Sequence, residues 1–150
     1  MSASAACIFG CEGTVLSPAE RDFFAETSPW GFILFARNVE TPDQLRRLTA
    51  QLRDAVGRDA PIFVDQEGGR VQRMKPPVWN QYPAGAAFDR LYDLAPASAI
   101  EAARANAQAL AIDLAEVGIS CTHAPVLDVR CEGAHDVIGD RSYGLEPMRV

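Results

Sequence analysis

Residues 61–73, PIFVDQEGGRVQR, indicate the fold of this chain most directly, because an apolar run leads straight into a polar turn. Residues 61–64 have the length and composition of a buried strand. Asp65 and Glu67 follow at its carboxyl end, and Gly68-Gly69 permit positive φ angles and a close approach of the backbone to a ligand. The stretch therefore predicts a strand that ends in a binding turn.

Strand-like and helix-like segments alternate on both sides of this stretch. Ser17 and Thr41 each precede a proline and are followed three residues later by Glu20 and Gln44, which is the pattern of a helix start. The resulting order, β-α-β-α-β-α-β, predicts an α/β fold with parallel strands and right-handed crossovers. We expect strands at residues 7–9, 31–35, 61–64 and 119–127, and the longest helix at residues 96–117.

Two of the expected helices carry a continuous apolar stripe. In the helix that ends at Gly57, the stripe consists of Leu45, Leu48, Leu52 and Val56. In the helix at residues 96–117, it consists of Ile100, Ala103, Ala107, Leu110, Leu114 and Val117. Stripes of this kind predict helices that pack with one face against a sheet.

The size and charge of the chain exclude several classes of protein. Its 150 residues correspond to one domain and are too few for a complete eight-stranded (β/α) barrel of roughly 250 residues. A formal charge of −6 argues against proteins that coat nucleic acid or bind membranes through basic patches. The sequence shows no signal-peptide pattern and no apolar run of roughly 20 residues. We therefore expect a cytoplasmic protein whose four cysteines are free thiols rather than disulfides or metal ligands.

Polar residues stand where the expected strands end. They are Arg37 and Asn38 after the second strand, Asp65 and Glu67 after the third, and Asp128 after the fourth. In parallel α/β folds the carboxyl ends of the strands form the ligand site. These residues either share such a site or simply begin the loops.

The turn at residues 65–73 also has two interpretations. Asp65 can accept hydrogen bonds from sugar hydroxyls, and Arg73 can donate a planar pair of hydrogen bonds to a carboxylate, carbonyl or hydroxyl. Alternatively, the arginines of the turn pair with Glu67 and with other surface acids. A phosphate cradle is weakly supported, because neither G-x-x-x-x-G-K-[ST] nor G-x-G-x-x-G occurs in the sequence.

A second polar loop, residues 133–144, is bounded by glycines. Its Arg141 is either a ligand clamp or part of an ion pair that stabilises the loop. An acid/base dyad of His135 and Asp136 is disfavoured, because adjacent residues seldom hydrogen-bond productively. We expect His123, within the fourth strand, to be a buried core histidine.

Four stretches stand in order along the chain: FILFARN (32–38), VDQEGGRVQR (64–73), APVLDV (124–129) and IGDRSYG (138–144). Together they resemble the N-terminal half of a bacterial β-N-acetylhexosaminidase of glycoside hydrolase family 3. The resemblance implies a TIM-like (β/α) barrel, of which residues 1–150 form the N-terminal portion of a single catalytic domain. It also implies a cytoplasmic enzyme that removes terminal β-linked N-acetylglucosamine from muropeptides in peptidoglycan recycling.

The resemblance assigns substrate-binding roles to Asp65, Arg73 and Arg141, and it implies no metal and no organic cofactor. It implies a retaining mechanism with an aspartate nucleophile and a histidine acid/base on a mobile loop. Both residues, and a K-H-F-P-G-H-G motif, are expected beyond Val150, so that no residue of this chain is assigned a catalytic role. We therefore expect residues 1–150 alone to be inactive and poorly stable, and the full-length enzyme to be monomeric.

Two alternatives remain open. The chain could be a small non-catalytic α/β module, flavodoxin-like in size, that binds sugars or phosphorylated ligands. It could instead be an assembly protein in which two half-barrels pair through their open edges.

Overall fold

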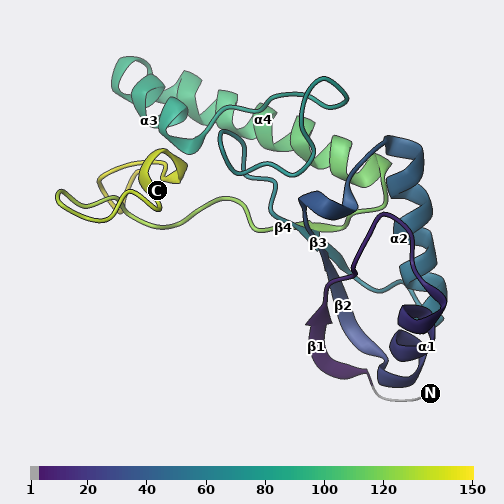
Figure 1. Cartoon of the computed structure of the whole chain (residues 1–150). Helices are drawn as coiled ribbons and strands as arrows, with labels where there is room; N and C mark the ends of the chain where they lie inside the picture. The colour runs from purple at the N-terminus through teal and green to yellow at the C-terminus, as the bar shows by residue number, and fades with distance from the viewer. Residues whose placement is uncertain (1–3) are drawn as a thin grey trace. The chain divides into compact units, whose positions relative to one another are not determined.

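The computed structural model describes residues 4–150. Its strands are β1 (Ala5–Phe9), β2 (Pro29–Leu34), β3 (Ile62–Val64) and β4 (Cys121–Thr122), and its helices are α1 (Pro18–Thr27), α2 (Pro42–Val56), α3 (Gly85–Leu94) and α4 (Pro96–Glu116) (Figure 1). Short 3-10 turns, η1 (Ala36–Asn38) and η2 (Gly139–Arg141), lie in the loops. The chain divides into two compact units: residues up to 65 with residues 113–122, and residues 66–112 with residues 123–150.

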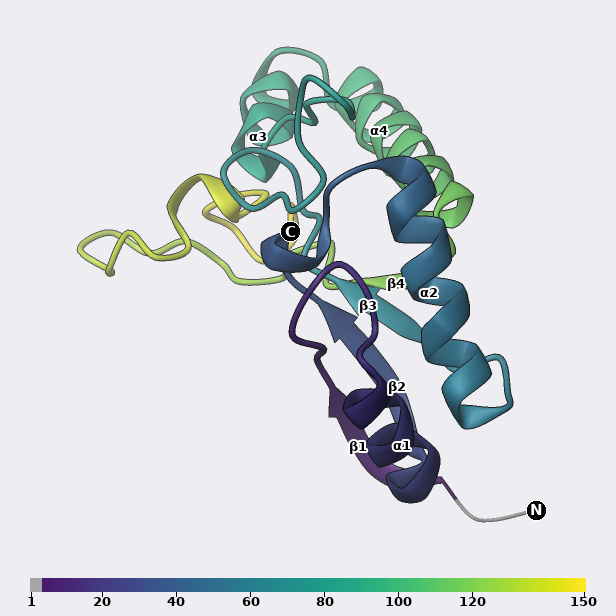
Figure 2. The same ribbon diagram turned by 45° about the vertical axis from the view of Figure 1, so that its right-hand side comes forward.

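The first unit is built on a parallel sheet with the strand order β1-β2-β3-β4. Phe32 of β2 stands opposite Ile62 of β3, and Phe63 of β3 stands opposite Cys121 of β4. Helices α1 and α2 lie on the same face of this sheet (Figure 2). A sequential order with helices on one face is that of a (β/α) barrel, whereas a flavodoxin-like sheet has the order 2-1-3-4-5.

Both predicted helix starts are confirmed. The Ser17 hydroxyl accepts a hydrogen bond from the Glu20 backbone N–H at 3.2 Å, and the Glu20 carboxylate accepts one from the Ser17 N–H at 3.1 Å. The Thr41 hydroxyl accepts a hydrogen bond from the Gln44 N–H in the same way. These contacts satisfy donors that the first turn of a helix cannot pair internally.

The core of the first unit lies between α2 and the sheet. Leu45, Leu48 and Leu52 of α2 are fully buried, as the stripe predicts, while Val56 is half-buried. From the sheet, they are joined by fully buried Phe32, Leu34, Ile62 and Val64. Complete burial of such a side chain contributes about 1.5–3 kcal/mol, so this cluster dominates the stability of the unit.

The second unit contains α3, a helix that the sequence reasoning did not predict. Its N-cap residue is Ala84, which makes no side-chain capping bond, and its first residue is Gly85. Neither residue is a helix-start signal. The helix is held instead by tertiary contacts, including the burial of Ala86 and Phe88.

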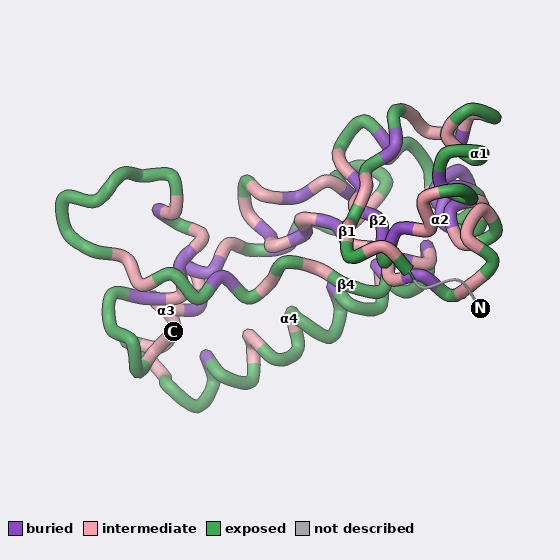
Figure 3. The backbone as a smooth tube through the Cα atoms, turned by 90° about the horizontal axis from the view of Figure 1, so that it is seen from below, coloured by how far each residue is buried: buried purple, intermediate pink, exposed green. Residues whose placement is uncertain are grey.

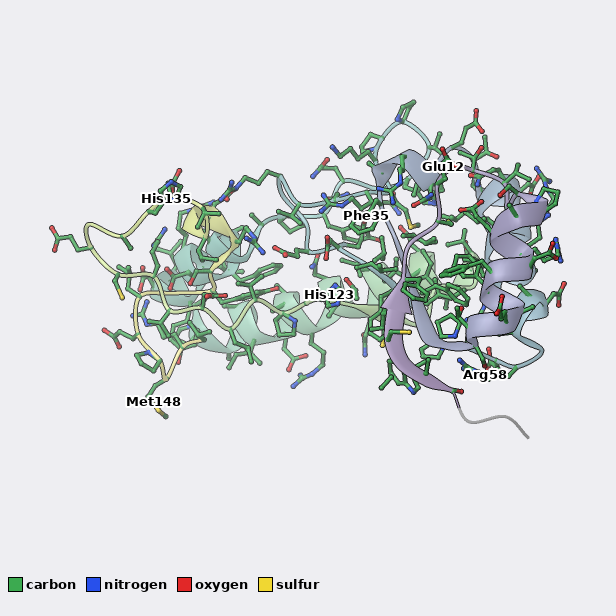
Figure 4. The ribbon with its side chains drawn as sticks, turned by 60° about the horizontal axis from the view of Figure 1, so that its bottom comes forward. Glu12, Phe35, Arg58, His123, His135 and Met148 are labelled. Carbon is green, nitrogen blue, oxygen red and sulfur yellow. The ribbon has the colours of Figure 1, made fainter. Side chains whose placement is uncertain are left out.

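Three expectations for residues 96–127 are wrong. The strand expected at residues 119–127 is paired only at Cys121–Thr122, because the chain then leaves the sheet at its edge. His123 is exposed rather than buried (Figure 4). Of the apolar stripe predicted at residues 96–117, only the C-terminal half, Leu110, Leu114 and Val117, is buried. Figure 3 shows exposed backbone along most of α4, where Ile100 and Ala107 face solvent.

Candidate functional site

The Gly-Gly turn of the second unit fits closely against residues 82–84. Gly68 and Gly69 have φ angles of 98° and 57°, and the Gly69 N–H donates to the Tyr82 carbonyl at 2.8 Å. A Cβ atom on Gly68 would lie 2.2 Å from the Pro83 carbonyl oxygen. The expected positive φ angles are therefore confirmed, but this close approach is to the chain's own backbone.

Two buried glutamines hold the segment that carries Arg73. The Gln66 amide oxygen accepts hydrogen bonds from the backbone N–H groups of Arg73 at 2.8 Å and Met74 at 3.1 Å. The Gln72 amide donates to the carbonyl of Met74 and accepts from the N–H of Tyr82. Because amide side chains both donate and accept, they fix the backbone on either side of the turn without adding charge to the interior.

Arg141 forms a two-point ion pair with Glu67, which lies 74 residues earlier in the chain. Its Nε donates to one carboxylate oxygen at 2.8 Å, and its Nη2 donates to the other at 2.7 Å. The two side chains are 23% and 9% exposed. Parallel hydrogen bonds of this kind fix the plane of the guanidinium as well as its position. Of the two interpretations of Arg141, the ion pair is present in the structure, and the ligand clamp stays a prediction.

Arg70 makes the second connection between the turn and the loop. Its Nε donates to Asp140 Oδ1 at 2.9 Å. Its Nη2 lies 2.9, 2.7 and 3.2 Å from the carbonyl oxygens of Asp136, Val137 and Ile138. The interpretation that arginines of the turn pair with surface acids is therefore confirmed for Arg70. Its contact with three successive carbonyls had no signal in the sequence.

Contacts with α3 and hydrogen bonds of the buried Ser142 hydroxyl hold the residues that follow Arg141. The Ser142 hydroxyl donates toward the carbonyls of Asp128 and Gly144, at 2.7 and 2.8 Å. Tyr143 stacks on Phe88 of α3, with ring centroids 5.8 Å apart. Burial, and then the negative charge of Glu67, raise the pKa of the Tyr143 hydroxyl, so this residue is neutral near pH 7.

The histidine of this loop takes no part in an acid/base dyad with its neighbour. His135 Nδ1 accepts a hydrogen bond from the Val137 backbone N–H at 3.0 Å. His135 is exposed and is labelled in Figure 4. This contact indicates that the His135 side chain stabilises the turn at residues 135–137.

Asp65, Arg37 and Asn38, which also follow strands, differ in their burial and in their contacts. Asp65 follows β3 directly and is half-buried. Asn38 is fully buried, and its amide donates to the carbonyls of Cys11 and Gly13 at 3.1 and 2.7 Å. Arg37 donates to the same Cys11 carbonyl. Arg37 and Asn38 thus tie the loop after β1, where Figure 4 labels Glu12, to the segment after β2, where it labels Phe35.

Neither a metal site nor a membrane span is found in the part of the chain that the structure describes. Among residues 4–150, no group of three or more His, Cys, Asp or Glu side chains is placed to hold a metal ion. No helix in this range is both long and apolar enough to cross a membrane. The four cysteines are free thiols, with Cys11 buried and Cys121 and Cys131 exposed.

Known β-hexosaminidases are similar to this chain in sequence. The chain is 38% identical over 143 residues to a β-hexosaminidase of Xanthomonas oryzae pv. oryzae, a match that covers 95% of this chain and 42% of that protein. A β-hexosaminidase of Alkalilimnicola ehrlichii is likewise 38% identical, with 40% of its length covered. The chain therefore spans less than half the length of these relatives.

Solved structures of NagZ from Neisseria gonorrhoeae superimpose on almost the whole chain. The structure with a zinc ion has a TM-score of 0.92 and 31% identity, covering 97% of this chain and 44% of NagZ. The structure with N-trifluoroacetyl-D-glucosamine has a TM-score of 0.91 and 30% identity, covering 97% of this chain and 43% of NagZ. The expected fold, the N-terminal portion of a TIM-like α/β barrel, is thereby confirmed.

The model of the glycosyl hydrolase family 3 N-terminal domain matches residues 17–150, which include the Gly-Gly turn and the Arg141 loop. The chain therefore belongs to glycosyl hydrolase family 3.

Proposed function

We propose that the protein is a β-N-acetylhexosaminidase that removes terminal β-linked N-acetylglucosamine from muropeptides during peptidoglycan recycling. The observation that carries this proposal is the close structural match to NagZ in complex with an N-acylated glucosamine analogue. The identity to curated β-hexosaminidases supports the same reaction class.

In this proposal Asp65, Arg73 and Arg141 bind the sugar. The Asp65 carboxylate accepts hydrogen bonds from ring hydroxyls, since an ionised carboxylate offers only acceptors. The two guanidinium groups donate to hydroxyl or N-acetyl carbonyl oxygens. The ion pair with Glu67 supports this role for Arg141, because it sets the guanidinium plane before a substrate arrives.

Residues 1–150 are proposed to form the N-terminal portion of a single catalytic barrel domain. The bond-breaking residues, an aspartate nucleophile and a histidine acid/base, are proposed to come from sequence beyond Val150. A retaining glycosidase needs a nucleophile on one side of the scissile bond and an acid/base group on the other, with a covalent glycosyl-enzyme intermediate between the two steps. Within the full-length enzyme, residues 1–150 then supply contacts to the sugar but no bond-breaking group, and no cofactor takes part.

We also propose that the full-length enzyme is a cytoplasmic monomer with a small-molecule carbohydrate substrate and no nucleic-acid partner. The formal charge of −6 supports the last point, because it opposes binding to a polyanion. Cell fractionation and sedimentation velocity of the full-length protein test the location and the monomeric state.

The central test uses the full-length protein and 4-nitrophenyl N-acetyl-β-D-glucosaminide. Asp65→Ala is expected to lower kcat/KM by about 10²- to 10⁴-fold, because hydroxyl recognition by a built site is lost. Asp59→Ala is the matched control in the same unit, since the Asp59 side chain is 92% exposed, and it should leave turnover unchanged. Near-normal turnover of Asp65→Ala would refute the assignment of Asp65.

Residues 1–150 expressed alone separate this proposal from the two alternatives. We expect no hydrolysis and no sharp unfolding transition. Cooperative unfolding together with saturable sugar binding would instead favour a self-sufficient binding module. A stable dimer in sedimentation would favour the assembly protein.

A further inference from the structure

Arg70 holds the loop before Arg141 through three backbone carbonyls as well as through an ion pair with Asp140. Its side chain is only 48% exposed, and one guanidinium nitrogen lies within 3.2 Å of three backbone carbonyl oxygens, at residues 136, 137 and 138. Three carbonyl dipoles that converge on one point repel one another unless a cation lies between them. The local path of residues 136–138 therefore depends on the Arg70 guanidinium, whose Nε binds Asp140 while its Nη2 binds the three carbonyls.

The same segment reaches Arg141 through a shared contact. The Val137 carbonyl lies 2.7 Å from Arg70 Nη2 and 3.3 Å from Arg141 Nη1. Gly139 makes the tight turn between them with a φ of 46°, and a Cβ there would lie 2.4 Å from Asp136 Oδ1. A shift of residues 136–138 would thus be transmitted to the backbone that carries Arg141.

Glu67 completes the arrangement from the other end of the Gly-Gly turn. It fixes the Arg141 side chain, while Arg70, three residues later, fixes the Arg141 backbone through residues 136–140. Both anchors belong to one short turn whose glycines fit tightly against residues 82–84. Two independent attachments to one rigid element restrict both the position and the orientation of the guanidinium.

We propose that Arg70 is a positioning residue for sugar binding: its guanidinium joins Asp140 to the carbonyls of residues 136–138 and so places Arg141, without itself touching the substrate. This inference rests on the proposed function, because it assigns Arg141 to the sugar site. It predicts that Arg70 acts only through Arg141.

The test is a double-mutant cycle in the full-length enzyme. Arg70→Lys keeps the positive charge but loses the fork that spans Asp140 and the carbonyls, and it should raise KM about 10- to 100-fold while kcat changes much less. In an Arg141→Ala background, the same Arg70→Lys change should have no further effect on kcat/KM. Arg104→Lys is the matched control, since Arg104 is exposed and makes an ion pair with Glu101 within one helix.

Limited proteolysis gives a second readout that needs no activity. Arg70→Lys should increase cleavage within residues 131–138, whereas the urea midpoint of the enzyme should shift little. A wild-type enzyme that does not hydrolyse the substrate would refute the proposed function, while increased loop cleavage would still support the anchor. An active enzyme with additive Arg70 and Arg141 effects, or with unchanged loop cleavage, would overturn the positioning role. If Arg70→Lys does not fold, Arg70→Gln is compared in the same cycle.

Discussion

Replacement of Gly68 by alanine tests how tightly the Gly-Gly turn is fitted against residues 82–84. The φ angle at Gly68 is 98°, and a Cβ atom would lie 2.2 Å from the Pro83 carbonyl oxygen and 3.1 Å from its carbonyl carbon. Real Cβ contacts essentially never fall below 3.0 Å. Because the neighbour is backbone, and its φ is restrained by the proline ring, it cannot move aside as a flexible side chain would.

The expected loss of stability has two parts. A left-handed φ costs a residue with a Cβ about 1–2 kcal/mol. Forced displacement of packed groups typically costs about 1–3 kcal/mol more. We therefore expect Gly68→Ala to lower the free energy of unfolding by about 2–5 kcal/mol.

Gly133→Ala provides the matched control in the same unit. Its φ is 75°, but a Cβ there meets nothing within 4 Å, so only the backbone penalty of about 1–2 kcal/mol applies. Urea unfolding of both full-length variants, followed by circular dichroism at one pH, gives the two free energies directly. Equal losses in the two variants would refute the close fit of the turn.

Two further predictions concern the first unit. Burial, and then the charge of Glu20, raise the pKa of the Cys11 thiol from 9.0 to about 11. At pH 8, iodoacetamide should therefore modify Cys11 far more slowly than exposed Cys131, and peptide mass spectrometry measures the two rates. The raised pKa also makes stability depend on pH. Because the folded state disfavours the thiolate, the contribution of Cys11 to the free energy of unfolding is complete below pH 9 and is lost as the pH rises toward 11. A Cys11→Ser variant should lack that loss in urea titrations. Thr41→Ala should lower the free energy of unfolding by about 1 kcal/mol by removing the cap of α2, whereas Thr41→Ser should leave it nearly unchanged because serine caps at least as well, and an equal cost for both would contradict the capping role.

Much of the fold could be predicted because its signals are local. The caps at Ser17 and Thr41 act over three residues, and the apolar stripe of α2 repeats with the helical period. Helix α3 could not be predicted in this way, since Ala84 gives no capping bond and Gly85 is a poor helix former. Its stability comes from burial of Phe88 and from stacking on Tyr143, which lies far away in the sequence.

The fourth strand is shorter than the sequence predicts. The sequence predicts a strand at residues 119–127, but pairing ends at Thr122, opposite Val64, because β3 itself ends at Val64. A strand at a sheet edge has unpaired groups along one side, and burial of its side chains depends on what covers it. Exposed His123 and Leu127 are the consequence.

By itself, the sequence determined the parallel α/β order, the capped starts of α1 and α2, and the residue types of the candidate site, Asp65, Arg73 and Arg141. Only the tertiary structure decided how the charged groups pair. Glu67 and Arg141 meet across 74 residues, and Arg70 meets both Asp140 and the carbonyls of residues 136–138. The physical reason is range: a cap depends on atoms within one turn, whereas an ion pair between loops depends on the path of the whole unit between them.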